Sequence, residues 1–191
     1  MTDDRLYFAG IVAVVAVQRL WEVRQSARHQ AVILALGGRE HAAGQLPWMR
    51  AVHAAWLAGM LIESWMKQRP VPTLLVVIGL MVFMVGQALR LLAMRELRER
   101  WTVSIMTLPG APAVSTGIFR HMRHPNYVGV CLELAALPLA GGAYWTAAVA
   151  SVANAALLHR RIRAEEHALR TDSDYARRLD PLPRFFPARL Q

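Results

Sequence analysis

Long apolar runs separated by arginine-rich segments constrain the fold of this chain more than any other feature. Five runs are apolar enough to cross or deeply enter a bilayer: residues 6–23, 49–66, 71–94, 127–140 and 142–158. The first three approach the ~20 apolar residues that a helix needs to cross a ~30 Å hydrocarbon core. With 55% hydrophobic residues, the chain is also too apolar for an ordinary soluble domain. We therefore predict an all-α integral membrane protein with about five transmembrane helices.

The last two apolar runs are short and nearly continuous. Only the stretch "AGG" separates them, and Pro138 lies just before it. Glycine tolerates the left-handed conformation that ends many helices, so we predict a tight helical hairpin with Gly141 and Gly142 at the turn. The sequence leaves open whether this hairpin crosses the membrane fully.

Arginine is concentrated in alternate connections between the apolar runs. Segments 24–50, 90–126 and 159–191 carry four, six and eight arginines, whereas the other connections carry at most two basic residues. Because cytoplasmic loops carry the excess of positive charge, we predict insertion in the inner membrane with the N-terminus outside and the C-terminus cytoplasmic. Contact with anionic headgroups then explains the net charge of +9, and no recognisable module for nucleic acid is present.

Ionisable residues inside apolar runs are costly and are therefore functional candidates. Arg19 and Glu22 are spaced i, i+3 near a cytoplasmic boundary, where snorkelling and local pairing suffice to explain them. His53 and Glu133 lie within about two turns of the cytoplasmic ends of their helices, so we expect both to face a shared substrate pocket. The single cysteine forms no internal disulfide, and no cluster of cysteine and histidine has metal-ligand spacing, so we expect no metal site.

Two polar motifs flank the predicted hairpin. The first, "RHPNYVG" at 123–129, introduces the fourth apolar run with a proline that biases His124 toward an extended conformation and exposes backbone groups. The second, "RIRAEE" at 161–166, lies where the fifth helix leaves the membrane and places a guanidinium and two carboxylates on overlapping faces. Taken alone, the second motif is typical of a solvated, salt-bridged helix.

Taken together, the motifs "GIFRHMRHPNYVG", "RIRAEE", "DSDYARR" and "PRFFP" resemble the isoprenylcysteine carboxyl methyltransferase family of integral membrane methyltransferases, over about residues 86–187. The resemblance implies S-adenosylmethionine as the cofactor. It also implies one methyltransferase domain over 1–191, with three N-terminal spans in 1–95 and a cofactor-binding half in 96–191. In that half, the 120–130 turn and the C-terminal helix and tail would form a cytoplasmic cofactor pocket.

The family resemblance also assigns roles to particular residues. Cofactor binding falls to His124, Pro125, Tyr127, Glu166 and Tyr175. Arg161 would orient the acceptor or bind its anionic oxygen, and Glu165 joins it in the catalytic set. In "PRFFP", we expect Arg184 on lipid headgroups and the two phenylalanines in the membrane interface.

The upstream half, from "WEVRQSARHQ" to "AGMLIE", is similar to a bacterial subgroup of the family that is associated with type III polyketide synthases. Members of that subgroup methylate hydroxyl groups of alkylpyrones and alkylresorcinols. This similarity implies a lipophilic phenolic acceptor, with membrane lipids around the protein and a type III polyketide synthase as pathway partner. The chain departs from those relatives at "GQLPW", where they often carry His-Tyr before the proline.

Other functions remain open. One is carboxyl methylation of a prenylated cysteine or a similar lipid acid. Another is a membrane reductase that uses NADPH, because sterol-type reductases share the "RHPNY" turn but generally lack the paired glutamates. A third is a non-catalytic lipid-binding protein. A carboxylate acceptor is already anionic, whereas a resorcinol with a pKa of roughly 10 needs a base, for which His53, His121 and His124 are the candidates.

Overall fold

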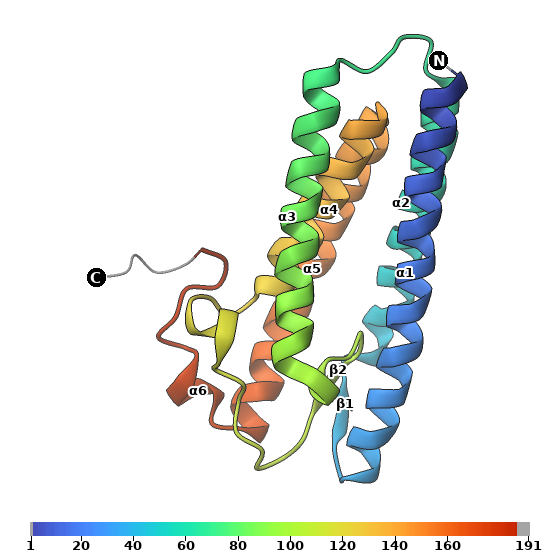
Figure 1. Ribbon diagram of the computed structural model, residues 1–191. Coiled ribbons are helices and arrows are strands. Elements are labelled where there is room, and N and C mark those ends of the chain that lie inside the picture. Colours follow the sequence, from blue (N-terminus) through green and yellow to red (C-terminus); the bar gives the residue numbers. More distant parts are fainter. Residues whose placement is uncertain (1, 187–191) are drawn as a thin grey trace.

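The computed structural model describes residues 2–186 and shows a bundle of five long helices with shorter elements and loops at one end (Figure 1). The long helices are α1 (Thr2–Ala35), α2 (Leu46–Met66), α3 (Thr73–Leu97), α4 (Pro125–Gly141) and α5 (Tyr144–Asp172). A short helix α6 (Tyr175–Arg178) and two short strands, β1 (Arg39–His41) and β2 (Ile105–Thr107), lie at that end. Together with the loops between 98 and 124 and the tail from 179 to 186, we call them the polar assembly.

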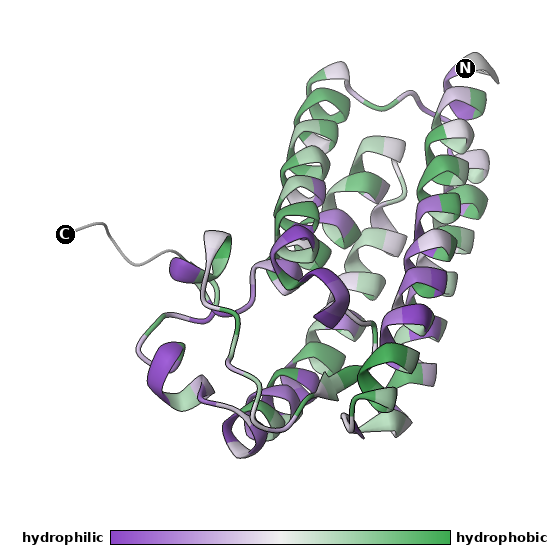
Figure 2. Ribbon diagram, turned by 60° about the horizontal axis from the view of Figure 1, so that its bottom comes forward, coloured by the Kyte–Doolittle hydropathy of each residue, from purple (hydrophilic) through white to green (hydrophobic). Residues whose placement is uncertain are grey.

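The surface of the bundle is apolar over much of its length. Two helical segments, Asp4–Ala35 and Thr73–Arg100, are long and apolar enough to cross a membrane by length and composition. Large side chains such as Val14, Met81 and Val152 are more than half exposed on the outside of the bundle. Figure 2 shows hydrophobic residues along the helices and hydrophilic residues gathered around the C-terminal tail. This surface suits contact with lipid, and the full five-span topology remains a prediction.

The predicted hairpin between the last two long helices is confirmed. Helix α4 ends at Gly141, and Gly142 adopts a left-handed conformation with φ of 75°. The amide groups of Gly142 and Ala143 donate to the carbonyl oxygens of Leu139 and Pro138 at 3.1 and 2.8 Å, which satisfies the end of the helix.

Helices α3 and α4 pack with their backbones in close contact. A Cβ atom on Gly86 would lie 2.8 Å from the carbonyl oxygen of Gly129, and one on Gly129 would lie 2.6 Å from that of Gly86. Small residues at both positions therefore permit this approach, as they do in membrane helix pairs. The contact fixes the start of α4, and with it the "RHPNYVG" motif, against α3.

Polar contacts hold α2 against the hairpin. The Glu63 carboxylate accepts hydrogen bonds from the backbone amides of Trp145 and Thr146, at 2.9 and 2.8 Å, and so caps the first turn of α5. The indole of Trp56 donates to the carbonyl oxygen of Leu134 at 3.2 Å. These contacts fix which face of α2 points toward the interior.

The structure corrects the prediction in two places. The first helix runs to Ala35 rather than to residue 23, because its polar continuation is helical beyond the apolar run. The all-α prediction missed an antiparallel sheet in which Glu40 pairs with Met106. Strands of three residues are too short to produce a period-2 pattern. The sheet is fastened to α5 by Asp172, which accepts a hydrogen bond from the Thr107 hydroxyl.

Candidate active site

A cavity of about 500 Å³ opens where the apolar bundle meets the polar assembly. All five long helices and the loop around 101–114 contribute to its wall. Seven of the nine residues predicted for the site line this cavity: His53, His124, Pro125, Tyr127, Arg161, Glu165 and Tyr175. Glu133 and Glu166 do not line it. The structure thus brings together residues from four separate helices and the turn before α4.

The loop that precedes β2 forms one wall and is tied to two helices. On α1, His29 contacts the carbonyl oxygen of Trp101 at 2.7 Å, and the Ser26 hydroxyl accepts the Val103 amide at 2.7 Å. From α5, Arg161 donates to the carbonyl oxygen of Val103. Trp101 is buried and lines the cavity.

Arg161, Tyr127 and Glu165 form a continuous chain of hydrogen bonds on the cavity wall. The Arg161 Nε donates to the Tyr127 hydroxyl at 2.8 Å, and that hydroxyl donates to the Glu165 carboxylate. Arg161 and Glu165 lie one turn apart on α5, so both reach the same residue of α4. The chain holds a buried guanidinium and a carboxylate at fixed positions in the cavity.

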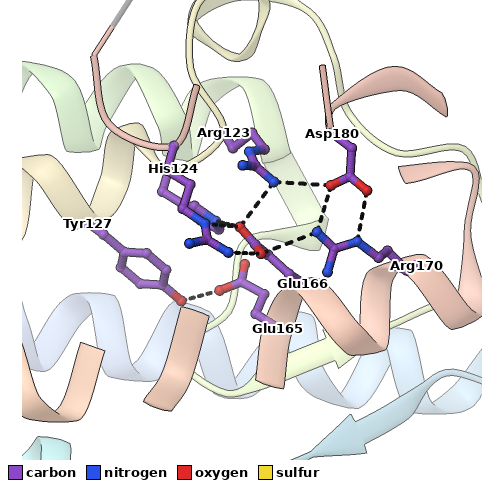
Figure 3. A network of polar contacts seen from close by, with 8 residues as sticks. Arg123, His124, Tyr127, Glu165, Glu166, Arg170 and Asp180 are labelled. Atoms are coloured by element: carbon purple, nitrogen blue, oxygen red, sulfur yellow. Dashed lines mark hydrogen bonds and ion pairs between the residues drawn. The ribbon is translucent and has the colours of Figure 1, made fainter. Parts of the chain in front are cut away.

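Glu166 lies behind that wall at the centre of an ionic cluster (Figure 3). Its carboxylate contacts His124 at 3.1 Å and Arg123 at 3.3 Å from the turn before α4. Arg184 of the tail binds both of its oxygens, at 2.9 and 2.8 Å, and Arg170 contacts it at 3.4 Å. The sequence assigned Glu166 to direct cofactor binding, but these partners occupy its oxygens.

The charge of Glu166 is stabilised by this cluster. Burial disfavours its carboxylate, but hydrogen bonds from His124 and Arg184 and the nearby charge of Arg123 outweigh burial and hold the pKa of Glu166 far below its ordinary value. Burial also raises the pKa of Tyr175, so its phenol stays neutral in the cavity wall. The Glu166 carboxylate therefore stays ionised across the physiological range.

The tail closes the cluster through its backbone as well. The amides of Arg123 and His124 donate to the carbonyl oxygens of Pro183 and Arg184, each at 3.0 Å. We predicted that the proline turn would leave these backbone groups exposed, whereas the tail occupies them. Arg184 also binds Glu166 through its guanidinium, and the expectation that it meets lipid headgroups stays a prediction. Of the "PRFFP" segment, residues 183–186 are described and 187 lies outside the described residues.

A second ionic cluster forms the floor of the cavity between α1, α3 and α4. Arg90 contacts Glu133 at 2.9 Å and Glu22 at 2.6 Å, and Arg19 contacts both carboxylates. Arg19, Glu22 and Arg90 line the cavity, while Glu133 is fully buried beneath them. The expectation that Glu133 faces a substrate pocket is therefore wrong, because two arginines cover it. Four charges that sum to zero are paired inside the bundle, as burial requires.

Sequence reasoning missed several residues that the structure places at the site. Arg123 and Arg184 complete the Glu166 cluster, which forms only because the tail folds back onto the turn before α4. Asn126, inside the quoted "RHPNY", lines the cavity, and its buried Oδ1 has no hydrogen-bond partner among the described residues. Residues 2–186 contain no group of three or more potential metal ligands.

Comparisons with known proteins agree with these motifs. The sequence model of the isoprenylcysteine carboxyl methyltransferase family matches residues 77–171, which include both polar motifs. Protein YpbQ of Bacillus subtilis (strain 168), described as uncharacterized, is 30% identical over 83% of this chain and 94% of its own length. An uncharacterized protein of Haemophilus influenzae is 30% identical over 85% of this chain and 92% of its own length. No solved structure matches the chain.

Proposed function

The chain belongs to the isoprenylcysteine carboxyl methyltransferase family, and from this premise we propose that it transfers a methyl group from S-adenosylmethionine to an oxygen atom of a lipophilic acceptor. Membrane association follows from the family and from the two apolar helices. The observation that carries the proposal is the cavity in which Arg161, Glu165, Tyr127 and the "RHPNY" turn converge.

The residues of the cavity fit the chemistry of this cofactor. S-adenosylmethionine carries an adenine, a ribose diol, a zwitterionic amino acid end and a sulfonium. The cavity offers the Glu165 carboxylate for positive charge, the Asn126 Oδ1 as a free acceptor, and the Trp101 and Tyr175 rings as apolar surface. Its volume of about 500 Å³ lies in the range of small-molecule sites.

We assign the chain's residues as follows. His124, Pro125, Tyr127 and Tyr175 bind the cofactor, which supplies a methyl group activated on a sulfonium. Glu166 does not contact the cofactor itself; it holds Arg123, His124 and the tail in place around the cofactor site. Arg161 and Glu165 orient the acceptor against the methyl group, and the Glu165 carboxylate also faces the positive charge of the cofactor. Positioning of this kind can supply several kcal/mol of the barrier without a covalent enzyme intermediate.

The acceptor enters from the bilayer, because the cavity lies where the apolar bundle meets the polar assembly. We favour the hydroxyl of an alkylpyrone or alkylresorcinol, on the resemblance of the upstream half, with a type III polyketide synthase as pathway partner. The carboxylate of a prenylated cysteine is the second candidate, and the family match is equally consistent with it. The arginine distribution supports an inner-membrane location with the site on the cytoplasmic side.

The test is a transfer assay with purified protein in detergent and S-adenosylmethionine labelled in the methyl group. The acceptors are 5-pentylresorcinol, a 4-hydroxy-6-alkyl-2-pyrone and N-acetyl-S-farnesylcysteine, with products identified by mass spectrometry. Labelled product that the Arg161→Ala variant fails to form supports the proposal. Oxidation of NADPH without methyl transfer would instead support a reductase, and the absence of both activities would support a lipid-binding protein.

A further inference from the structure

His53 lines the cavity, and one of its imidazole nitrogens has no hydrogen-bond partner among the described residues. Its Nδ1 lies 2.9 Å from the backbone carbonyl oxygen of Met49, one turn earlier on α2. A carbonyl oxygen only accepts hydrogen bonds, so Nδ1 carries the hydrogen, and Nε2 of the neutral ring holds a lone pair. Nε2 has no hydrogen-bond partner among the described residues. The backbone of α2 has thus set the tautomer that can accept a proton.

His53 lies close to the Arg161 chain. Arg161 Nη1 contacts the sulfur of Met49 at 3.4 Å, and Met49 and His53 share one face of α2 because they are four residues apart. The ring of His53 is therefore about one helical turn from this contact, on the side of α2 that lines the cavity.

The other candidate bases are less suitable. His121 is exposed and does not line the cavity. His124 already binds Glu166 through Nε2 and stacks on Tyr127 with ring centroids 5.3 Å apart. Glu165 lines the cavity, but it accepts the Tyr127 hydroxyl, and a carboxylate is a weaker base toward a phenol than an imidazole is.

We propose that Nε2 of His53 is the general base that removes the acceptor's proton, so that the natural acceptor is a neutral hydroxyl rather than a carboxylate. This inference rests on the proposed methyl transfer. The acceptor oxygen bonds to the methyl carbon while the carbon–sulfur bond of the sulfonium breaks, and the bonding pair stays on sulfur. The hydroxyl proton passes to Nε2, so the positive charge moves from sulfonium to imidazolium.

Charged groups around the cavity act on both products of the proton transfer. The titratable groups that share the cavity with His53 are Arg19, Glu22, Arg50, Arg90, Glu99, Arg100, Arg123, His124, Tyr127, Arg161, Glu165 and Tyr175. Arginines outnumber carboxylates in this set, so the carboxylates offset only part of the charge that the ring gains, whereas the arginines favour the developing oxyanion. Arg161 donates to Tyr127, Met49 and Val103, and its remaining N–H groups can point to that oxyanion. A carboxylate acceptor, already ionised at neutral pH, has no proton for His53 to remove.

The test compares His53→Asn, His53→Gln and a control, His159→Asn. Asparagine can still donate to the Met49 carbonyl oxygen, and glutamine places an amide near Nε2, but neither is a base. His159 is exposed on α5 and does not line the cavity. Transfer to 5-pentylresorcinol and to N-acetyl-S-farnesylcysteine is measured from pH 5 to pH 10. Calorimetry measures S-adenosylhomocysteine binding and, without cofactor, 5-pentylresorcinol binding.

We expect both His53 variants to lose at least about 100-fold in kcat on the resorcinol, the range for a general base, while the control stays within about threefold. The wild-type rate on the resorcinol should rise with pH as a histidine loses its proton, and the variants should lack this rise. Cofactor binding should be unchanged, and resorcinol binding to the cofactor-free protein should weaken about tenfold. Equal losses on both acceptors, no loss, or transfer to the carboxylate alone would overturn the assignment of His53. Absent cofactor binding would instead overturn the proposed methyl transfer.

Discussion

Substituting Glu166 by glutamine tests whether one carboxylate orders the tail and the "RHPNY" turn. The variant keeps the shape of the side chain but removes a charge that three arginines share. Breaking a buried ionic network costs about 3–5 kcal/mol when charges are left without partners. Arg170 and Arg184 are 40% and 45% exposed and can be rehydrated, whereas Arg123 is only 12% exposed. We therefore expect a loss of about 3 kcal/mol, the low end of that range.

The assay for Glu166→Gln combines the free energy of unfolding in detergent with amide hydrogen exchange. The amides of Arg123 and His124, which bind the tail, should exchange faster in the variant, because the tail is then held by fewer contacts. Glu40→Gln is the control, since that exposed carboxylate lies outside the cluster and should contribute no more than about 1 kcal/mol. A loss below about 0.5 kcal/mol with both amides still protected would refute this account of the cluster.

Three further predictions concern stability. Folding lowers the pKa of Glu166, so its contribution to the free energy of unfolding is complete above its unfolded pKa of about 4.3 and declines as the pH falls below that value. Thermal unfolding measured from pH 7 to pH 3 should show this loss of stability. The Glu166→Gln variant should show a smaller dependence on pH. Gly129→Leu should separate α3 from α4 and prevent stable folding, as judged by gel filtration, whereas Gly10→Leu, which meets nothing within 4 Å, should not. Glu133→Gln should cost about 3–5 kcal/mol in a denaturation assay, and Arg90→Met combined with Glu133→Met should restore most of that loss, because no buried charge of that pair then remains.

Local patterns predicted much of the architecture. Long apolar runs indicated the helices, and the two glycines after Pro138 indicated the hairpin turn, because these signals lie within a few residues of one another. The small sheet was not predictable, since Glu40 and Met106 are far apart in sequence and their strands are three residues long. The polar half of α1 was missed because it lacks the apolar pattern that marked the first half.

The candidate site was predicted less evenly. The two motifs correctly indicated that His124, Tyr127, Arg161 and Glu165 would lie together, and their roles in binding and catalysis remain predictions. The partners of Glu166 and Glu133 were not predictable, because each depends on distant segments packing against one another. Arg184, for example, lies 18 residues beyond Glu166, and its orientation depends on how the tail returns to α4.

The most direct test of the central claim is calorimetric binding of S-adenosylhomocysteine to the detergent-purified protein, in the wild type and in Glu165→Ala. Glu40→Ala, which removes a carboxylate of β1 outside the cavity, is the control. We predict saturable binding at one site per chain, weakened at least about tenfold by Glu165→Ala through the loss of a charge contact, and unchanged in the control. Absence of saturable binding to the wild-type protein would contradict the assignment of this cavity to methyl transfer.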